Sequence, residues 1–337
     1  MKNHYKYPSI EQFRNVVRNV KYKSENYKFD LPKLKFIGTE KIHGTNAAIV
    51  IPSDGEVYFQ SRERILSLES DNAGFAQWGY SNIDVFNVAT VHDVKTVIVY
   101  GEWCFDNIQK NVAYTGLPKS FVVFDILATN GEEHFWWEDK DKINEFVGFC
   151  KKSGIENIYS IYDFKTWEFE IDFNQPELSI ESLNAAMTEV EENSPIGAYL
   201  NNLMGRETNN TTGEGIVIKC VTEGYEGSNY WAKVKGEKHS ASKVKTLAAV
   251  DVERINDIQE LSAKLASVER MDQMLEKTFN LMNGGMIEMS KTKEYLKNLM
   301  DDIVKEELDT IQASGFTIKE ISGNISKIAV GYMKSKF

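Results

Sequence analysis

The chain has 337 residues, enough for two ordinary domains, and a hydrophobic fraction of 42% with 12% aromatic residues indicates that it folds. Its net charge of −11 argues against a protein that coats nucleic acid through bulk positive charge, because phosphate binding requires basic groups. No apolar run approaches the roughly 18 residues that a membrane span requires, so we expect no membrane partner. Cys104, Cys150 and Cys220 are too few and too widely spaced for a zinc site or a disulfide framework. We expect a monomer in the reducing cytoplasm.

Short apolar runs between Leu34 and about residue 127 predict β-strands joined by tight turns. The runs are rich in β-branched residues and are broken by Gly, Asp and Asn. Phe121 to Leu127 and Gly215 to Val221 continue this pattern. Residues 130–205 mix acidic, aromatic and helix-forming segments, in which Leu183 to Val190 predicts a helix.

The last part of the chain carries a helical pattern. Apolar residues recur at helical spacing from Ile258 to Phe279, from Leu296 to Leu308 and from Ile318 to Ile328, which predicts three helices. We therefore predict an α+β chain, with an antiparallel-sheet domain over residues 1–248 and a small all-helical C-terminal domain over residues 249–337.

The segment Glu40-Lys41-Ile42-His43-Gly44-Thr45-Asn46 places a lysine close to a glycine at the end of a predicted strand. A lysine that bonds covalently to a nucleotide has to reach the α-phosphorus in line with the departing pyrophosphate. A glycine three residues later lets the backbone pass close to the nucleotide. The Lys-x-x-Gly pattern alone also fits an exposed lysine before a turn.

Five further blocks follow the lysine segment in a fixed order. They are Gln60-Ser61-Arg62, Val99-Tyr100-Gly101-Glu102, Val123-Phe124-Asp125, Gly213-Glu214-Gly215-Ile216-Val217-Ile218-Lys219 and Trp231-Ala232-Lys233-Val234-Lys235. Together the six blocks resemble the nucleotidyltransferase motifs of covalent ligases over about residues 36 to 240. The match is closest to the RNA ligase 2-like family, the phage nick-sealing and RNA-editing ligases, whose first motif reads Glu-Lys-x-His-Gly-x-Asn.

Two features separate this resemblance from related enzymes. DNA ligases and capping enzymes usually have aspartate where this chain has His43. They generally follow the catalytic domain with a five-stranded barrel, whereas a helical C-terminal domain is similar to the RNA ligase 2 pattern. The resemblance implies that residues 1–248 form an antiparallel-sheet nucleotidyltransferase domain of the covalent ligase type.

The resemblance implies that Lys41 is the nucleophile and forms a lysyl-AMP intermediate from ATP, with Mg²⁺ or Mn²⁺. An amine attacks only without its proton, and nearby cations favour loss of that proton. Lys219, Lys233 and Lys235 would supply them and bind the nucleotide phosphates. Lys233 and Lys235 flank Val234, so on a strand both amines point to one side.

Five lysines between residues 233 and 245 form either a local basic groove or a solvated surface turn.

The same resemblance assigns the nucleoside contacts. Glu40 would accept from the adenine amino group, Phe124 would stack on the base, and Arg62 and Glu102 would hold the ribose. Glu214 would serve the metal and, with Lys41, Lys233 and Lys235, make up the catalytic set.

The acceptor strand has its own expected contacts. Asn46, Arg62 and His43 would contact its phosphate. Phage members also carry an aromatic pair at the nick, for which Phe75 and Trp78 are candidates here.

Structural roles compete with several of these assignments. Phe124 lies in an apolar run and could be core, Asp125 fits a structural partner better than a catalyst, Glu102 could be a surface carboxylate, and His43 could be a satisfied structural histidine.

We expect an enzyme, an ATP-dependent RNA ligase that seals 3′-hydroxyl and 5′-phosphate ends, preferably at nicks in duplex RNA. The alternatives are an ATP-dependent DNA ligase, a GTP-dependent mRNA capping enzyme, and a catalytically silent nucleic-acid-binding scaffold. An A-form duplex is recognised by shape and 2′-hydroxyls, so a base-reading motif is not expected.

Overall fold

The computed structural model describes residues 2–27, 33–88, 94–106, 108, 112–137, 140–225, 227–235 and 258–336. The chain divides into two compact units, Met1–Val234 and Lys235–Phe337. The expected boundary at residue 248 lies outside the described residues, as do Lys238, Lys243 and Lys245. Within the described part, no helix is long and apolar enough to cross a membrane.

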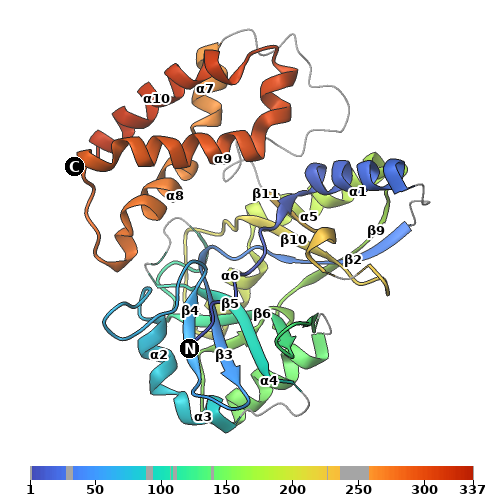
Figure 1. Cartoon of the computed structure of the whole chain (residues 1–337), viewed down its shortest axis with the longest axis vertical. Coiled ribbons are helices and arrows are strands. Elements are labelled where there is room, and N and C mark those ends of the chain that lie inside the picture. The colour runs from blue at the N-terminus through green and yellow to red at the C-terminus, as the bar shows by residue number, and fades with distance from the viewer. Residues whose placement is uncertain are drawn as a thin grey trace. The chain divides into compact units, whose positions relative to one another are not determined.

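The first unit contains two β-sheets (Figure 1). Five strands form one sheet, in the order β1 (Glu11–Gln12), β11 (Trp231–Lys235), β10 (Gly215–Cys220), β2 (Lys33–Glu40) and β9 (Thr166–Asp172). The other has the order β4 (Tyr58–Ser61), β3 (Gly44–Pro52), β5 (Thr96–Cys104), β6 (Ser120–Thr129) and β7 (His134–Trp136), and β8 (Ile158–Ser160) also pairs with β6. The expected strands are therefore confirmed, and the α+β class with them.

Strand pairing is mainly antiparallel. This holds for β10–β2, β2–β9, β3–β4, β3–β5, β5–β6 and β6–β7, whereas β1–β11 and β6–β8 are parallel. Residues 47–51 of β3 and 96–101 of β5 are buried on both faces of the sheet. Central strands buried on both faces are continuous apolar runs, and this is the pattern that the sequence shows.

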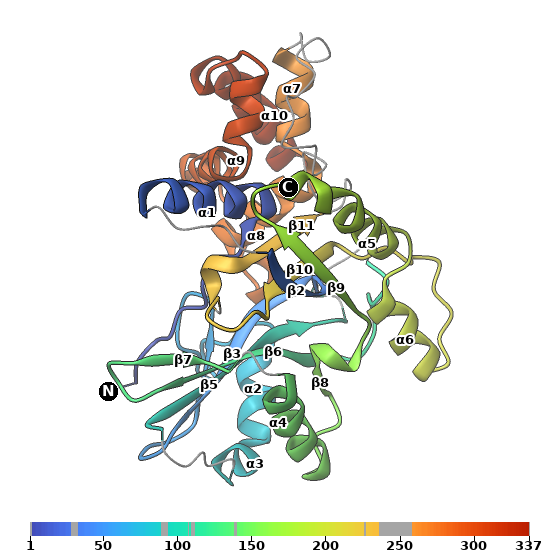
Figure 2. The ribbon, with the colours of Figure 1, turned by 90° about the vertical axis from the view of Figure 1, so that its right-hand side faces the viewer.

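Helices cover the sheets of the first unit (Figure 2). They are α1 (Phe13–Tyr27), α2 (Phe75–Ser81), α3 (Ile83–Val88), α4 (Lys140–Lys152), α5 (Ile180–Glu192) and α6 (Pro195–Leu203), with short 3₁₀ turns at Ile161–Asp163, Pro176–Ser179 and Ser228–Tyr230. The predicted helix Leu183–Val190 lies within α5 and is confirmed. Contacts join α4 to β6 and β8, and α5 to β9 and β10.

The described part of the second unit is helical. It contains α7 (Ile258–Leu265), α8 (Val268–Phe279), α9 (Thr292–Ala313) and α10 (Ile318–Lys334), with 3₁₀ turns at Leu281–Asn283 and Met289–Lys291. The prediction of a single helix from Ile258 to Phe279 is wrong, because the helical conformation is interrupted between α7 and α8. Ser267 caps α8 there, where its hydroxyl accepts a hydrogen bond from the backbone of Arg270.

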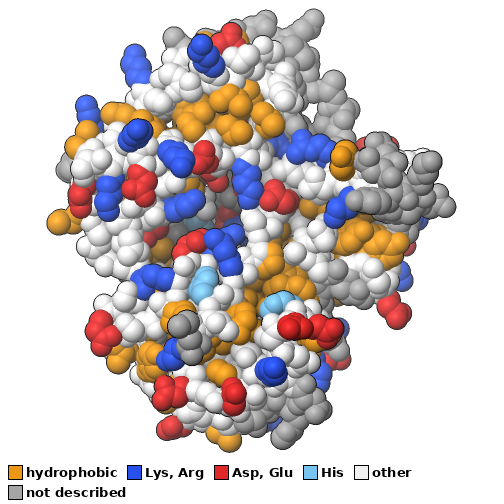
Figure 3. Space-filling view, in the orientation of Figure 1, with side chains coloured by type: hydrophobic (Ala, Val, Ile, Leu, Met, Phe, Trp, Pro, Cys, Tyr) orange, Lys and Arg blue, Asp and Glu red, His pale blue; other side chains and the backbone are white. Residues whose placement is uncertain are grey.

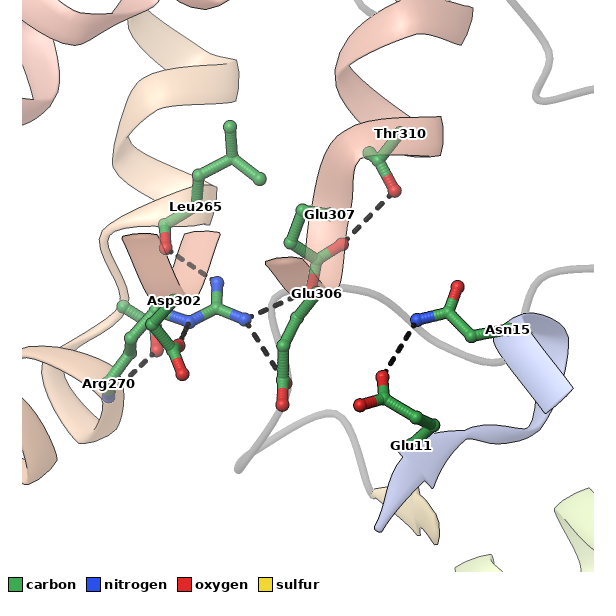
Figure 4. Close-up of polar contacts among 9 residues, drawn as sticks. Glu11, Asn15, Leu265, Arg270, Asp302, Glu306, Glu307 and Thr310 are labelled. Carbon is green, nitrogen blue, oxygen red and sulfur yellow. Dashed lines mark hydrogen bonds and ion pairs between the residues drawn. The ribbon is translucent and has the colours of Figure 1, made fainter. Parts of the chain in front are cut away.

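A buried arginine ties α8 to α9 in this unit (Figure 4). Arg270 Nε lies 3.0 Å from Asp302 Oδ2, and its Nη2 lies 3.1 Å from Glu307 Oε1 and 3.7 Å from Glu306 Oε2. Its Nη1 donates to the carbonyl of Leu265. Burial lowers the pKa of Arg270, but the carboxylates, Glu307 foremost, raise it above the usual value. Arg270 therefore remains a cation inside the helical unit.

Candidate active site

Lys41 and Glu214 meet at the place where β2 ends and β10 begins. The backbone N–H of Lys41 donates to the carbonyl of Gly215 at 2.8 Å, which fixes the two strand ends side by side. Lys41 Nζ then lies 2.5 Å from Glu214 Oε2. Glu214 is only 3% exposed, whereas the lysine side chain keeps a quarter of its surface in solvent. A cationic partner stabilises a buried ionised carboxylate, and Lys41 is in position to provide one.

His43 joins the same carboxylate. Its Nδ1 lies 3.3 Å from Glu214 Oε2, and its backbone N–H donates to the hydroxyl of the buried Tyr114 at 2.8 Å. One oxygen of Glu214 therefore has both Lys41 and His43 as neighbours. The structure brings these three expected site residues together.

Gly44 allows β3 to start directly beside β5. A Cβ at this position would lie 2.6 Å from the carbonyl oxygen of Trp103 and 2.7 Å from Cys104 Cβ, which is too close for any side chain. The β3–β5 register then places Asn46 opposite Glu102. Asn46, expected to contact the acceptor RNA, and Glu102, expected to hold the ribose, therefore lie on neighbouring β-strands at one end of the sheet.

The pKa of Glu102 is set by burial and by the charges of Lys41 and Glu214. Burial raises the pKa of Glu102 to about 7; the Glu214 carboxylate also raises it, while Lys41 and Arg62 lower it. Arg62, which follows β4, forms a 3.9 Å ion pair with Glu63 and is substantially exposed. Glu102 is thus a partly protonated carboxyl near neutral pH, under the electrostatic influence of the site.

Phe124 occupies a β-bulge. Tyr100 pairs with Asp125 and Gly101 pairs with Val123, so Phe124 has no partner across β5. A bulge reorients a side chain relative to the regular alternation of a strand. The Phe124 ring is partly buried, which is compatible with both its expected stacking role and a supporting role in the core.

Lys219 lies beside this bulge. Its Nζ lies 2.5 Å from Asp125 Oδ2 and 3.1 Å from the carbonyl oxygen of Phe124. The same ammonium lies 5.6 Å from the Phe124 ring centroid and 4.8 Å from that of Trp231. Asp125 is buried and pairs with Lys219, which fits the structural role expected of it; that role stays a prediction.

The last two lysines lie on β11. Lys233 is half-buried and pairs in register with Gln12 of β1. Lys235 ends the strand, and its side chain lies outside the described residues. Their expected roles at the phosphates therefore stay predictions.

Glu40 faces away from Lys219. It lies opposite Ile216 in the β2–β10 register, whereas Lys219 lies opposite Ile37, so strand alternation puts the two on different faces. Ser194 Oγ donates to Glu40 Oε1 at 2.5 Å, and the backbone N–H of Ile196 donates to Oε2 at 3.0 Å. Burial raises the pKa of Glu40 to about 7, although both hydrogen bonds lower it.

The adenine contact expected of Glu40 stays a prediction. Both of its carboxylate oxygens already accept hydrogen bonds from protein groups, so a base would have to compete with Ser194 or Ile196.

The interpretation of Phe75 as a nick-stacking residue is wrong. Phe75 is fully buried, and its ring packs against Trp103 and Phe121. Trp78 is only partly buried and donates to Asn157 at 2.9 Å. The apolar side of the short helix α2 forms core, which explains the aromatic spacing without a ligand.

Sequence reasoning missed Ser194, Tyr114 and Tyr7 as neighbours of the site. Ser194-Pro195 is a helix-start signal, with a capping residue before a first-turn proline. The two tyrosines carry no local signal, because their partners are distant in sequence.

Metal binding would depend on carboxylates. Among the described residues, no group of three or more His, Cys, Asp and Glu side chains could hold a metal ion. On the face shown in Figure 3, lysine and arginine side chains are interspersed with acidic ones.

Lys41 at the end of β2 and the buried Glu214 just before β10 thus form a lysine–carboxylate pair at the junction of two strands. Residues 34–235 match the sequence model of the family described as RNA ligase, which spans more than half of the chain. The chain belongs to the RNA ligase family.

Solved structures to which the chain is similar include a mutant of an RNA ligase of Naegleria gruberi with ATP and manganese, and the RNA ligase of the same organism with pyrophosphate. Each is 15% identical to this chain, with a TM-score of 0.45 over 70% of it. This chain covers 57% of the Naegleria protein's length.

Proposed function

We propose that this protein is an ATP-dependent RNA ligase of the RNA ligase 2-like type, which joins 3′-hydroxyl and 5′-phosphate ends through a lysyl-AMP intermediate on Lys41. The observation that carries the proposal is the pairing of Lys41 Nζ with the buried Glu214 at the junction of β2 and β10, inside the region that matches the RNA ligase family. A preference for nicks in duplex RNA, a cytoplasmic location and a monomeric state belong to the same proposal.

Lys41 would act as the nucleophile of the first step. Its amine forms a bond to the α-phosphorus of ATP while the bond to the pyrophosphate oxygen breaks, and the amine loses its proton. During this step Nζ has to move away from the Glu214 carboxylate, because the amine cannot face the carboxylate and the α-phosphorus in the same direction. Glu214 Oε2, which starts 2.5 Å from Nζ, is a suitable acceptor for the proton.

The remaining steps return Lys41 to its free form. A 5′-phosphate oxygen of RNA attacks the AMP phosphorus and the nitrogen–phosphorus bond breaks, which leaves a 5′-5′ pyrophosphate. The 3′-hydroxyl then attacks the RNA phosphorus and AMP departs. Both are in-line phosphoryl displacements, in which positioning and charge stabilisation carry most of the catalysis. Lys219, Lys233 and Lys235 would stabilise the phosphates, and Asn46, His43 and Arg62 would hold the acceptor strand.

A divalent ion fits this site when the substrate supplies further ligands. Magnesium in proteins is commonly held by one or two carboxylates together with substrate phosphates. Glu214 would be the carboxylate that holds it, together with the substrate phosphates. The ion would neutralise phosphate charge.

The nucleoside assignments complete the proposal. Phe124, reoriented by its bulge, would stack on adenine, and Arg62 and Glu102 would hold the ribose. Glu40 would select adenine when the adenine amino group replaces the Ser194 hydroxyl as a hydrogen-bond donor to its carboxylate.

The test is covalent labelling. Pure protein, first treated with pyrophosphate to remove any bound AMP, is incubated with magnesium and either α-labelled ATP or α-labelled GTP, then separated under denaturing conditions. We expect label from ATP, lost in Lys41→Ala and retained in Lys35→Ala, which removes an exposed lysine from the same strand. Label from GTP would indicate a capping enzyme, and a folded protein without label would indicate a silent scaffold.

A second assay identifies the substrate. We expect wild-type protein to seal a nicked RNA duplex faster than a nicked DNA duplex, and Lys41→Ala to seal a pre-adenylylated nick but not a nick supplied with ATP. Full sealing from ATP by Lys41→Ala would refute Lys41 as the nucleophile.

A further inference from the structure

The segment Asn3–Tyr7, called the strap below, lies across β4 and β5 of the catalytic unit. Tyr5 exchanges two hydrogen bonds with the Gln60 side chain, at 3.0 and 2.5 Å, and its carbonyl also accepts from the Tyr100 hydroxyl at 2.9 Å. The hydroxyl of Tyr58 donates to the carbonyl of Asn3 at 2.6 Å. These contacts fix the strap on strands that carry the second and third sequence blocks.

Tyr7, the last residue of the strap, contacts Asp125, which pairs with Lys219 of the candidate site. It is 4% exposed, and its hydroxyl donates to Asp125 Oδ2, the same oxygen that pairs with Lys219 Nζ. Burial and the Asp125 carboxylate raise the pKa of the Tyr7 hydroxyl well above its usual value, so the hydroxyl stays a donor at all working pH values. Asp125 is thus held between one neutral donor and one cation.

The Tyr7 ring also supports the aromatic side chains around Lys219. Its centroid lies 5.1 Å from that of Phe124 and 5.7 Å from that of Trp231, with the Tyr7 and Trp231 rings nearly parallel. Lys219 Nζ lies near both of these partner rings. Tyr7 therefore contacts Asp125, Phe124 and Trp231, three side chains that also lie against Lys219 Nζ.

We propose that Tyr7 is a positioning residue for nucleotidyl transfer: through Asp125 and the two rings it fixes where Lys219 meets the nucleotide phosphates and where Phe124 meets the base. The proposal rests on the proposed function of the site and adds to it a residue outside the six sequence blocks. Tyr7 itself acts through Asp125 and is not expected to touch the reacting atoms.

A pair of single-hydroxyl variants tests this proposal. Tyr7→Phe removes the donor to Asp125 and keeps the ring. Tyr58→Phe is the matched control, because it removes one hydroxyl hydrogen bond from the same strap without a contact to Asp125. The measurement is single-turnover self-adenylylation on Lys41 as a function of ATP concentration, with thermal unfolding recorded in parallel.

We expect Tyr7→Phe to lower the ratio of maximal rate to half-saturating ATP by about tenfold, and Tyr58→Phe to change it less than twofold, at similar melting temperatures. Combined with Asp125→Asn, Tyr7→Phe should have little further effect, because residues acting through one partner are not additive. If Tyr7→Phe fails to fold, Asp125→Asn alone gives a second test, with a loss at least as large expected.

Two results would overturn the proposal while leaving the proposed function intact. The first is that wild type becomes labelled and the ratio of maximal rate to half-saturating ATP for Tyr7→Phe is within twofold of the wild-type ratio. The second is that the effects of Tyr7→Phe and Asp125→Asn on this ratio multiply in the double variant. Absence of labelling in wild type itself would overturn the proposed function, and the role of Tyr7 with it.

Discussion

One oxygen of Glu214 has two neighbours, Lys41 Nζ at 2.5 Å and His43 Nδ1 at 3.3 Å. Glu214→Gln keeps the shape of the side chain but removes its charge. We expect it to slow self-adenylylation by about a hundredfold, because a buried electrostatic partner of the reacting amine is lost. It should also slow sealing of a pre-adenylylated nick, since the proposed metal role applies to every step.

Glu63→Gln provides the comparison for that experiment. Glu63 is an exposed carboxylate paired with Lys6 and Arg62, so its charge should contribute little. A Glu214→Gln enzyme that labels at the wild-type rate would remove Glu214 from the catalytic set.

Glu40 makes folding stability depend on pH. Its pKa is about 7 in the folded chain against 4.5 for an ordinary glutamate, so between these values the folded state holds a proton that the unfolded state has lost. Stability therefore falls as pH rises through this window, by about 3 kcal/mol for this group. Glu40→Gln cannot ionise and should lose less stability between pH 4.5 and 7 than wild type does.

Urea unfolding of the two proteins at several pH values measures this difference. All six tryptophans lie between Trp78 and Trp231, so their fluorescence reports on the first unit alone. Glu102, whose pKa is also about 7, is present in both proteins and cancels. A wild-type stability that rose relative to Glu40→Gln with increasing pH would contradict the buried, proton-holding environment of Glu40.

At the scale of elements, the start of β3 depends on the missing side chain of Gly44. In Gly44→Ala the new Cβ would contact the Trp103 carbonyl and Cys104 Cβ at less than 3 Å, and backbone cannot move aside as a flexible side chain can. We expect a loss of about 2 kcal/mol in the free energy of unfolding, followed by tryptophan fluorescence, and a matching loss of self-adenylylation.

Gly148→Ala is the opposite case in the same unit. Gly148 lies inside α4, where nothing approaches an added Cβ within 4 Å. Alanine is the better helix former, so this variant should gain about 0.5–1 kcal/mol and keep full activity. Equal effects of the two substitutions would mean that packing around Gly44 is not what limits it.

Sequence patterns predict elements better than the contacts between them. Apolar runs located β3, β5, β6 and β10 because strand burial is written into neighbouring residues. The break at Ser267 was missed because the apolar spacing continues across it, and only the capping hydrogen bond reveals that α8 starts there. The bulge at Phe124 was missed because it depends on the register of β5, which is not a property of β6 alone.

At the scale of the whole molecule, the two units should respond separately to mutation. Arg270→Met removes the cation that Asp302 and Glu307 share inside the helical unit, and Glu307 is fully buried. Breaking a buried ion pair from one side costs about 3–5 kcal/mol. We expect the helical circular dichroism signal to show an earlier transition in urea, with the tryptophan transition unchanged.

Lys336→Met is the control for Arg270. It removes an exposed ion pair with Asp272, 3.4 Å long, in the same unit. Exposed pairs contribute little, so its transition should stay within about 0.5 kcal/mol of wild type. A shift of the tryptophan transition in Arg270→Met would show that the two units unfold together.

The sequence named most of the residues that the structure brings together, but not how they pair. Lys41 and Glu214 were both expected at the site, yet their contact spans 173 residues and depends on the pairing of β2 with β10. Ser194 and Tyr7 were not expected, because a serine and a tyrosine become informative only once their distant carboxylate partners are known. Local pattern identifies candidates, and topology decides which of them meet.

The strap has a consequence for how the protein folds. Tyr7 and Asp125 are 118 residues apart, and β1 pairs with β11, so elements from opposite ends of the unit close the same sheet. Contacts between residues so far apart in sequence form late in folding, because the entropy cost of closing the long loop comes before the contacts stabilise the chain. On the ribosome the lysine of the first block is made early, but its carboxylate and the closing strand emerge only near the end of the unit. The Lys41–Glu214 pair therefore forms only in chains whose first unit is nearly complete.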